Sequence, residues 1–264
     1  MRELPTGIVY KDNKSLLHLL LRFMYWLVAS TGFLKTRYGI QSYAYIYGQF
    51  KSITEGRVRN KVCSFIKPNT LAIDVGANIG TFTRVMIDKI GSKGKVVAIE
   101  PERQNVTFLR QCFSDELECG ILNVIECVVT DKIGDFFLHI DPCNPGGHSV
   151  ATTGVQVKGR TIDRIVNDES LIPSFIKIDV EGHEERVFLG AKETIKNYHP
   201  IIFMEFNPIL LSACDTDPLK LLQHFKENDY RFHLIEKGLE LREFSTIQII
   251  DITKKKEFVE ILMI

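Results

Sequence analysis

LAIDVGANIG, residues 71–80, sets the architecture of this chain. An apolar strand over 71–75 runs into a glycine-rich turn, and the spacing predicts a helix from about 79 to 90. In parallel sheets, ligands bind where such strands end. Gly76 and Gly80 would let the backbone approach a ligand closely, and the helix start would offer unpaired N–H groups. A capped turn without a ligand is the plainer alternative.

The rest of the chain alternates short apolar runs with amphipathic ones. This alternation predicts an α/β fold with a mostly parallel, Rossmann-like sheet and helices on both faces. Two late strands without an intervening helix indicate a final antiparallel strand. Further strands are predicted at 95–99, 122–129, 136–140, 175–180, 201–206, 231–235 and 246–252. Further helices are predicted at 54–66, 102–113, 161–167, 183–197 and 218–228.

Carboxylates follow the first strands. Asp74 lies beside the glycine-rich turn and suits a ligand that carries positive charge, such as the ammonium and sulfonium of S-adenosylmethionine (SAM). Glu100, followed by Pro101, comes 20 residues after Gly80, where an acidic residue can accept hydrogen bonds from ribose hydroxyls. That spacing fits NAD as well as SAM. Asp131 is a weaker candidate for the adenine edge, and a solvated loop position is the alternative.

A second polar cluster follows the strand in FIKIDVEGHE, residues 175–184. Asp179, Glu181, His183 and Glu184 are costly to gather unless the site is used, although acids at a helix start also favour the helix dipole. The stretch PIIFMEFNP, residues 200–208, then places a glutamate, Glu205, among apolar residues. A half-buried glutamate needs a partner, which neighbouring backbone could also supply.

Composition excludes several classes of protein. The 264 residues are 45% hydrophobic and carry 33 basic and 33 acidic side chains, so no net basic field holds a nucleic acid, and we expect no such partner. The six cysteines form no C-x-x-C pair, which argues against a zinc knuckle or redox dithiol. Scattered cysteines suit reduced thiols and a cytoplasmic protein.

The N-terminal region, residues 1–50, is predicted to be a helical extension to a domain over 51–264. Its apolar segment, residues 16–34, is interrupted by His18 and Arg22 and is too short in its purely apolar part to span a bilayer. We expect an amphipathic helix that packs on the domain or on a second subunit of a homo-oligomer. Peripheral membrane contact is the alternative.

Taken together, the segments IDVGANIG, EP, VKGRTIDRI, IKIDVEGHE and PIIFMEFNP resemble the FkbM family of SAM-dependent methyltransferases over residues 69–208. The resemblance implies a class I methyltransferase sheet of seven strands in the order 3-2-1-4-5-7-6, with the seventh antiparallel. It also implies SAM as cofactor and O-methylation of a hydroxyl on a sugar, a glycan or a secondary metabolite. A family does not fix the acceptor.

Roles are assigned on this basis. His183 is our proposed base, because an imidazole accepts a proton near neutral pH, with Asp179 and Glu205 as alternatives. Oxygen ligands of this kind could also hold a divalent metal, which we do not predict. The cofactor-binding residues are predicted to be Asp74, Gly76, Asn78, Gly80, Glu100, Pro101, Asp131 and Asp179. The substrate-binding residues are predicted to be Glu181, His183, His148 and Ser149, the last two in a loop over 141–153 that could close over the acceptor.

Two other classes compete with this interpretation. An NAD-dependent oxidoreductase or epimerase would carry G-x-G-x-x-G after the first strand, whereas this chain has GANIG at 76–80. A SAM-binding partner subunit without turnover would have a degraded acceptor side, whereas DVEGHE at 179–184 is intact.

Overall fold

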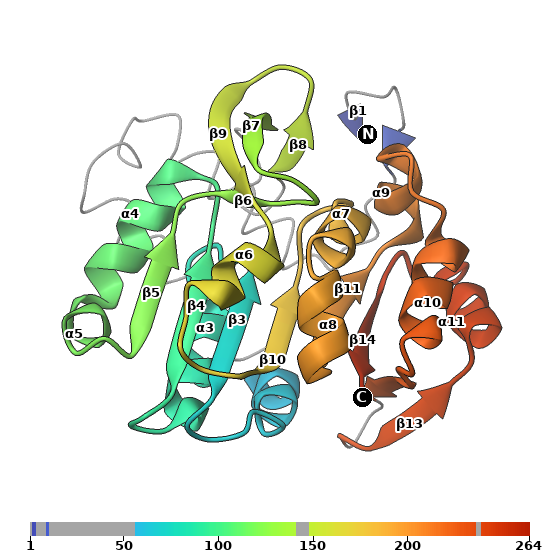
Figure 1. Cartoon of the computed structure of the whole chain (residues 1–264). Helices are drawn as coiled ribbons and strands as arrows, with labels where there is room; N and C mark the ends of the chain where they lie inside the picture. The colour runs from blue at the N-terminus through green and yellow to red at the C-terminus, as the bar shows by residue number, and fades with distance from the viewer. Residues whose placement is uncertain (1, 4–8, 11–55, 141–147, 236–238) are drawn as a thin grey trace.

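The computed structural model describes residues 2–3, 9–10, 56–140, 148–235 and 239–264 (Figure 1). Of the predicted N-terminal extension it describes only two short antiparallel strands, β1 (Arg2–Glu3) and β2 (Val9–Tyr10). The apolar segment over 16–34 lies outside the described residues. Within the described part of the chain, no helix has the length and apolar character needed to cross a membrane.

The main sheet has eight strands in the order β13-β12-β14-β11-β10-β3-β4-β5. Its parallel part confirms the predicted strands and their order, since the first, β3, lies centrally between β4 and β10. These strands are short and mostly buried, as a sheet covered on both faces requires. The parallel strands are β3 (Leu71–Val75), β4 (Lys95–Ile99), β5 (Leu122–Ile125), β10 (Pro173–Ile178) and β11 (Ile201–Phe206).

The C-terminal end of the sheet differs from the prediction. Residues 246–252 are not a strand but form helix α11 (Thr246–Thr253), because Ser245 and Gln248 make a capping box that fixes the helix start. The antiparallel strand is instead β14 (Val259–Met263), inserted between β11 and β12 (Phe232–Ile235). An added edge strand, β13 (Leu241–Phe244), brings the sheet to eight strands rather than seven.

A second sheet stands beyond the carboxyl ends of the parallel strands (Figure 1). The predicted strand over 122–129 is split, because β5 stays in the main sheet while β6 (Val128–Val129) pairs with β9 (Val155–Arg160). The sheet is completed by β7 (Gly134–His139) and β8 (Ser149–Ala151). Of the predicted closing loop, residues 141–147 lie outside the described residues, and 149–151 form a strand.

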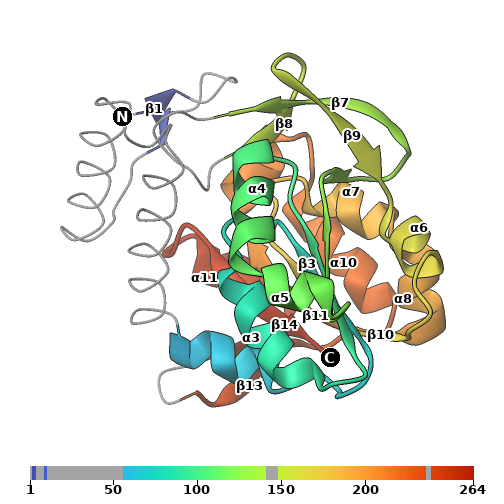
Figure 2. The ribbon, with the colours of Figure 1, turned by 90° about the vertical axis from the view of Figure 1, so that its left-hand side faces the viewer.

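Helices cover both faces of the main sheet and bury two apolar cores (Figure 2). One face carries the helical residues 56–63 with α3 (Thr81–Ile90), α4 (Arg103–Cys112) and α5 (Ser114–Glu118). The other face carries α6 (Ile162–Asn167), α7 (Glu184–Leu189), α8 (Lys192–Tyr198), α9 (Pro208–Ala213), α10 (Pro218–Glu227) and α11.

The helix predicted over 183–197 is broken into α7 and α8 at Gly190. A Cβ at Gly190 would lie 2.1 Å from the Thr130 carbonyl oxygen, so the backbone passes against the start of the second sheet there. The break therefore fixes α7 beneath that sheet, next to the end of β10.

Candidate active site

The turn after β3 uses its glycines for packing inside the protein. Gly76 and Gly80 both have positive φ, at 76° and 80°, where other residues are strained. A Cβ at Gly76 would lie 1.9 Å from the Asp179 carbonyl oxygen, and one at Gly80 would lie 2.6 Å from the Phe113 ring. These glycines thus bring the ends of β3 and β10 together and seat α4 against the turn. Their predicted contact with a ligand stays a prediction beside this packing role.

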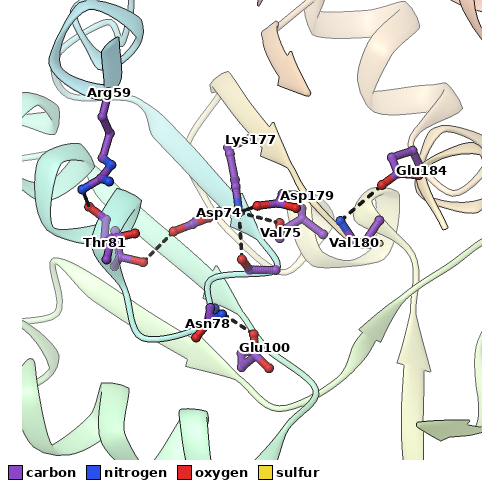
Figure 3. A network of polar contacts seen from close by, with 12 residues as sticks. Arg59, Asp74, Val75, Asn78, Thr81, Glu100, Lys177, Asp179, Val180 and Glu184 are labelled. Carbon is purple, nitrogen blue, oxygen red and sulfur yellow. Dashed lines mark hydrogen bonds and ion pairs between the residues drawn. The ribbon is translucent and has the colours of Figure 1, made fainter. Parts of the chain in front are cut away.

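Asp74 is fully buried and bonded to protein groups (Figure 3). The Thr83 hydroxyl donates to Asp74 Oδ2 at 2.6 Å, and Asp74 Oδ1 lies 3.4 Å from Lys177 Nζ. The prediction that this carboxylate faces the positive charge of a ligand is therefore corrected. Asp74 instead ties the first turn of α3 to β10.

Lys177 is the site residue that the sequence analysis missed. Only 4% of it is exposed, and its ammonium donates to the Gly76 carbonyl at 2.8 Å and lies 3.4 Å from Asp179 Oδ2. Burial disfavours its charge, but Asp179 and Asp74 outweigh burial and raise the pKa of Lys177. The available signal was a lysine inside a strand, PSFIKI, whose other residues are apolar or small.

Glu100 is held by the turn and by the start of α4. Its Oε2 accepts from the Asn78 backbone N–H at 2.8 Å, and its Oε1 accepts from the Glu102 N–H at 3.0 Å (Figure 3). Asn78 has a φ of 50°, which Asn tolerates better than most residues, and Pro101 is half-buried between the two glutamates. Burial raises the pKa of Glu100 to about 7 although backbone donors favour its ionised form.

The end of β10 presents the predicted acceptor-side residues. The Asp179 side chain is 39% exposed, and Glu181 adopts a φ of 53°, which is rare for a glutamate. His183 Nε2 lies 3.3 Å from the Thr130 hydroxyl. Burial, and next the positive charge of Arg186, lower the pKa of His183 to about 4, so its imidazole is neutral at pH 7.

Glu184 is buried at the first turn of α7. Its Oε1 accepts from the Gly182 N–H at 3.2 Å and the Val180 N–H at 3.4 Å (Figure 3). Its Oε2 is buried without a hydrogen-bond partner among the described residues. Burial raises the pKa of Glu184 to about 7.

Glu205 is half-buried near the end of β11, directly opposite Glu260 of β14. Burial, followed by the negative charges of Asp179 and Glu181, raises the pKa of Glu205 well above its ordinary value. Burial and the neighbouring negative charges thus disfavour the ionised form of Glu205.

The remaining predicted residues lie around the second sheet. Asp131 follows β6, and its Oδ2 lies 3.0 Å from Arg186 of α7. Partial burial opposes its charge, but the Thr130 hydroxyl and Arg186 lower the pKa of Asp131. His148 precedes β8 and Ser149 begins it, which places both on the second sheet rather than at the ends of β10 and β11. Across the described ranges, no group of three or more His, Cys, Asp or Glu side chains is placed to hold a metal ion.

The site is therefore assembled from neighbouring strand ends. The turn after β3, Glu100 after β4, the polar residues after β10 and Glu205 of β11 lie on adjacent strands of the main sheet. Carboxyl ends of adjacent parallel strands lie at one edge, so the ordered motifs of the sequence converge there. Residues 74–232, which include this whole edge, match the family model described as the methyltransferase FkbM domain.

This chain belongs to the FkbM methyltransferase family, whose methyl donor is SAM. It is 30% identical over 132 residues to the hexuronic acid methyltransferase AglP of Haloferax volcanii, across 49% of this chain and 53% of AglP. The chain thus matches about half the length of that relative.

Two solved structures are also similar to the chain. The methyltransferase FkbM of Methylobacillus flagellatus has 17% identity and a TM-score of 0.47, covering 75% of this chain and 48% of that one. Aeropyrum pernix fibrillarin, solved with SAM, has 10% identity and a TM-score of 0.42, covering 75% of this chain and 67% of that one.

Proposed function

We propose that this protein is an O-methyltransferase that methylates a hydroxyl of a sugar, a glycan or a secondary metabolite. The observation that carries the proposal is the meeting of Glu100 with the segment from Asp179 to His183 at one sheet edge, inside the FkbM-matched region. SAM supplies a methyl group activated on a sulfonium. The residues of this chain then have to bind the donor and the acceptor, align the two, and accept the hydroxyl proton.

On the donor side, Glu100 fits a ribose diol. Its carboxylate is oriented by the Asn78 and Glu102 N–H groups and by the Asn105 side chain, which donates to Oε1 at 3.4 Å. Oε2 retains a further lone pair for a hydroxyl donor. Asp131, after β6, is our proposed contact for the adenine amino group, with Arg186 as its orienting partner. Asp179, partly exposed beside the turn, takes the place that we first gave to Asp74 as the carboxylate nearest the positive charge of the donor.

On the acceptor side, His183 is the proposed base. Its neutral imidazole at pH 7 can accept the hydroxyl proton, and Thr130 fixes its ring through Nε2. Asp179 is the alternative acceptor of that proton. Glu205 is the second alternative acceptor of that proton, and its raised pKa favours proton uptake. Glu181, with its unusual backbone angle, and His148 with Ser149 on the second sheet are proposed to contact the acceptor.

A sugar is the proposed acceptor class because the relative named above is a hexuronic acid methyltransferase, and sugars present hydroxyls in pairs that clustered carboxyl groups bind. Two alternative functions, an NAD-dependent oxidoreductase or epimerase and a SAM-binding subunit without turnover, are disfavoured by the GANIG turn and by the intact DVEGHE segment.

Calorimetry with SAM, S-adenosylhomocysteine (SAH) and NAD tests the donor. We expect binding of SAM and SAH but not NAD, and the reverse would refute the proposal. Mass spectrometry with a panel of neutral, amino and acidic sugars then tests turnover. A gain of one methyl group on a hydroxyl is expected, whereas SAM binding without methylation of any acceptor would favour the partner-subunit alternative.

A further inference from the structure

Lys177 joins the two halves of the candidate site. From the middle of the sheet its ammonium reaches the turn after β3, where it donates to the Gly76 carbonyl at 2.8 Å and lies 3.4 Å from the Val75 carbonyl. On the other side it lies 3.4 Å from Asp179 Oδ2, at the start of the acceptor-side segment (Figure 3). One buried cation therefore contacts both turns.

The surroundings of Lys177 leave the ammonium little freedom. Asp74 of β3 lies 3.4 Å away, and the Phe82 ring of α3 lies with its centroid 5.6 Å from Nζ. The lysine is 4% exposed, whereas the Asp179 side chain that it contacts is 39% exposed. Two further titratable carboxyl groups near Asp179 are those of Glu184 of α7 and Glu205 of β11. A buried, fully engaged cation thus holds a carboxylate whose other side remains accessible.

Buried ion pairs are often replaceable by apolar groups without loss of stability, so stability alone is a weak reason for a buried lysine at this position. Here the ammonium is shared between Asp74, which has no exposed surface, and Asp179, which does. It also binds the carbonyl of the glycine whose Cβ position is filled by the Asp179 carbonyl. The spacing of the two turns is therefore set at this one point.

We propose that Lys177 is a positioning residue for methyl transfer, which holds the Gly76 carbonyl of the donor turn and the Asp179 carboxylate of the acceptor edge at one fixed spacing. This inference rests on the proposed function. The charge of Lys177 orients Asp179, and its hydrogen bond to the Gly76 carbonyl orients the turn. The two contacts can be separated, since glutamine keeps a donor for a carbonyl but loses the charge.

The test compares Lys177→Gln with the charge-matched double variant Lys177→Met/Asp74→Asn, which leaves no buried carboxylate of the pair unbalanced. Ile178→Val is the control, because it trims a buried neighbour on β10 without touching the ammonium. Each variant is measured by chemical denaturation, SAH calorimetry, turnover at saturating substrates, and amide hydrogen exchange of residues 76–80 without ligand.

We expect the double variant to fold, to bind SAH about tenfold more weakly, as for one lost hydrogen bond to a charged group, and to exchange its turn amides faster. Lys177→Gln should keep the SAH affinity and the slow amide exchange of the wild type. Its kcat should fall about tenfold, because Asp179 is no longer oriented. Ile178→Val should change neither.

If Lys177→Gln folds poorly because it leaves buried Asp74 without its cation, the double variant still decides through its SAH affinity and the exchange of its turn amides. Wild-type affinity, kcat and exchange in both folded Lys177 variants would overturn the proposal, as would equal losses in Ile178→Val. If the wild-type protein neither binds SAH nor methylates, the proposed function itself fails, and that result is separate because it involves no substitution.

Discussion

The turn after β3 and the turn after β10 are built from similar residues but are satisfied differently. Around the first, both Glu100 oxygens accept hydrogen bonds from backbone N–H groups. Asp74 accepts a hydrogen bond at Oδ2, and its buried Oδ1, which has no hydrogen-bond partner among the described residues, lies 3.4 Å from the Lys177 ammonium. Around the second, Asp179 is partly exposed, and Glu184 has a buried oxygen without a hydrogen-bond partner in the described structure. The carboxylate of Asp74 at the first turn is thus fully buried against a cation, whereas Asp179 at the second turn is in contact with the same cation but partly exposed. This contrast suits the proposed placing of the donor at the first turn and of the acceptor at the second.

The largest expected effect is a loss of folding stability at the turn after β3. Gly76→Ala should cost about 4 kcal/mol or more in the free energy of unfolding, because its Cβ would lie 1.9 Å from the Asp179 carbonyl oxygen and its φ is positive. Gly120→Ala is the matched control, since Gly120 has a φ of 78° with open space around its Cβ position. That control should cost about 1 kcal/mol from backbone strain alone. Equal losses in urea denaturation would show that the close approach of the two turns is unimportant.

The next effect concerns the acceptor edge only. His183→Ala should lower kcat by about a hundredfold, the lower range for loss of a general base, with SAH affinity unchanged. Stopped-time methylation assays and SAH calorimetry on the same preparation measure the two quantities. Near-normal turnover with intact SAH binding would remove His183 as the base and transfer that role to Asp179.

The unpartnered oxygen of Glu184 predicts a pH effect on stability. The pKa of Glu184 is raised by burial from its ordinary 4.5 to about 7, so the folded protein loses stability as pH rises through this window. Glu184→Gln should keep the acceptor for the Gly182 N–H and remove the charge. We expect it to be about 2 kcal/mol more stable than the wild type at pH 8 and equal to it at pH 4. Lower stability of the variant at pH 8 would mean that the carboxylate has a partner.

The smallest effect concerns donor binding. Burial raises the pKa of Glu100 to about 7, and protonation removes acceptor capacity for ribose hydroxyls. SAH affinity should therefore fall as pH drops below 7, by up to about tenfold per unit. Calorimetry from pH 5 to 8 measures this fall, and Glu100→Gln should show low affinity at every pH. A wild-type affinity that stays constant over this range would argue against contact between Glu100 and the ligand.

The parallel half of the fold could be predicted because apolar strands and glycine-rich turns are local signals. The C-terminal end could not, because the isoleucine-rich run over 246–252 favours a strand by composition while the Ser245 capping box starts a helix. β14 was missed for a related reason, since it is placed by pairing with strands distant in sequence.

Within the site, the carboxylates could be found from sequence, but their partners could not. Asp74 was expected to face a ligand, and its burial against Thr83 and Lys177 depends on which face of the sheet each residue occupies. The exposure of Asp179 depends on the same feature, because side chains along a strand alternate between the two faces of the sheet. Lys177 is paired with Asp74 on the adjacent strand, and Asp179 follows two residues later. A lysine inside an apolar strand was the one local sign of this network.

A crystal structure with SAH bound tests whether the methyl donor lies at this edge of the sheet. We expect the ribose hydroxyls within hydrogen-bond distance of Glu100, with the sulfur directed toward the segment from Asp179 to His183. SAH bound at another edge of the sheet, or with its ribose away from Glu100, would contradict this expectation.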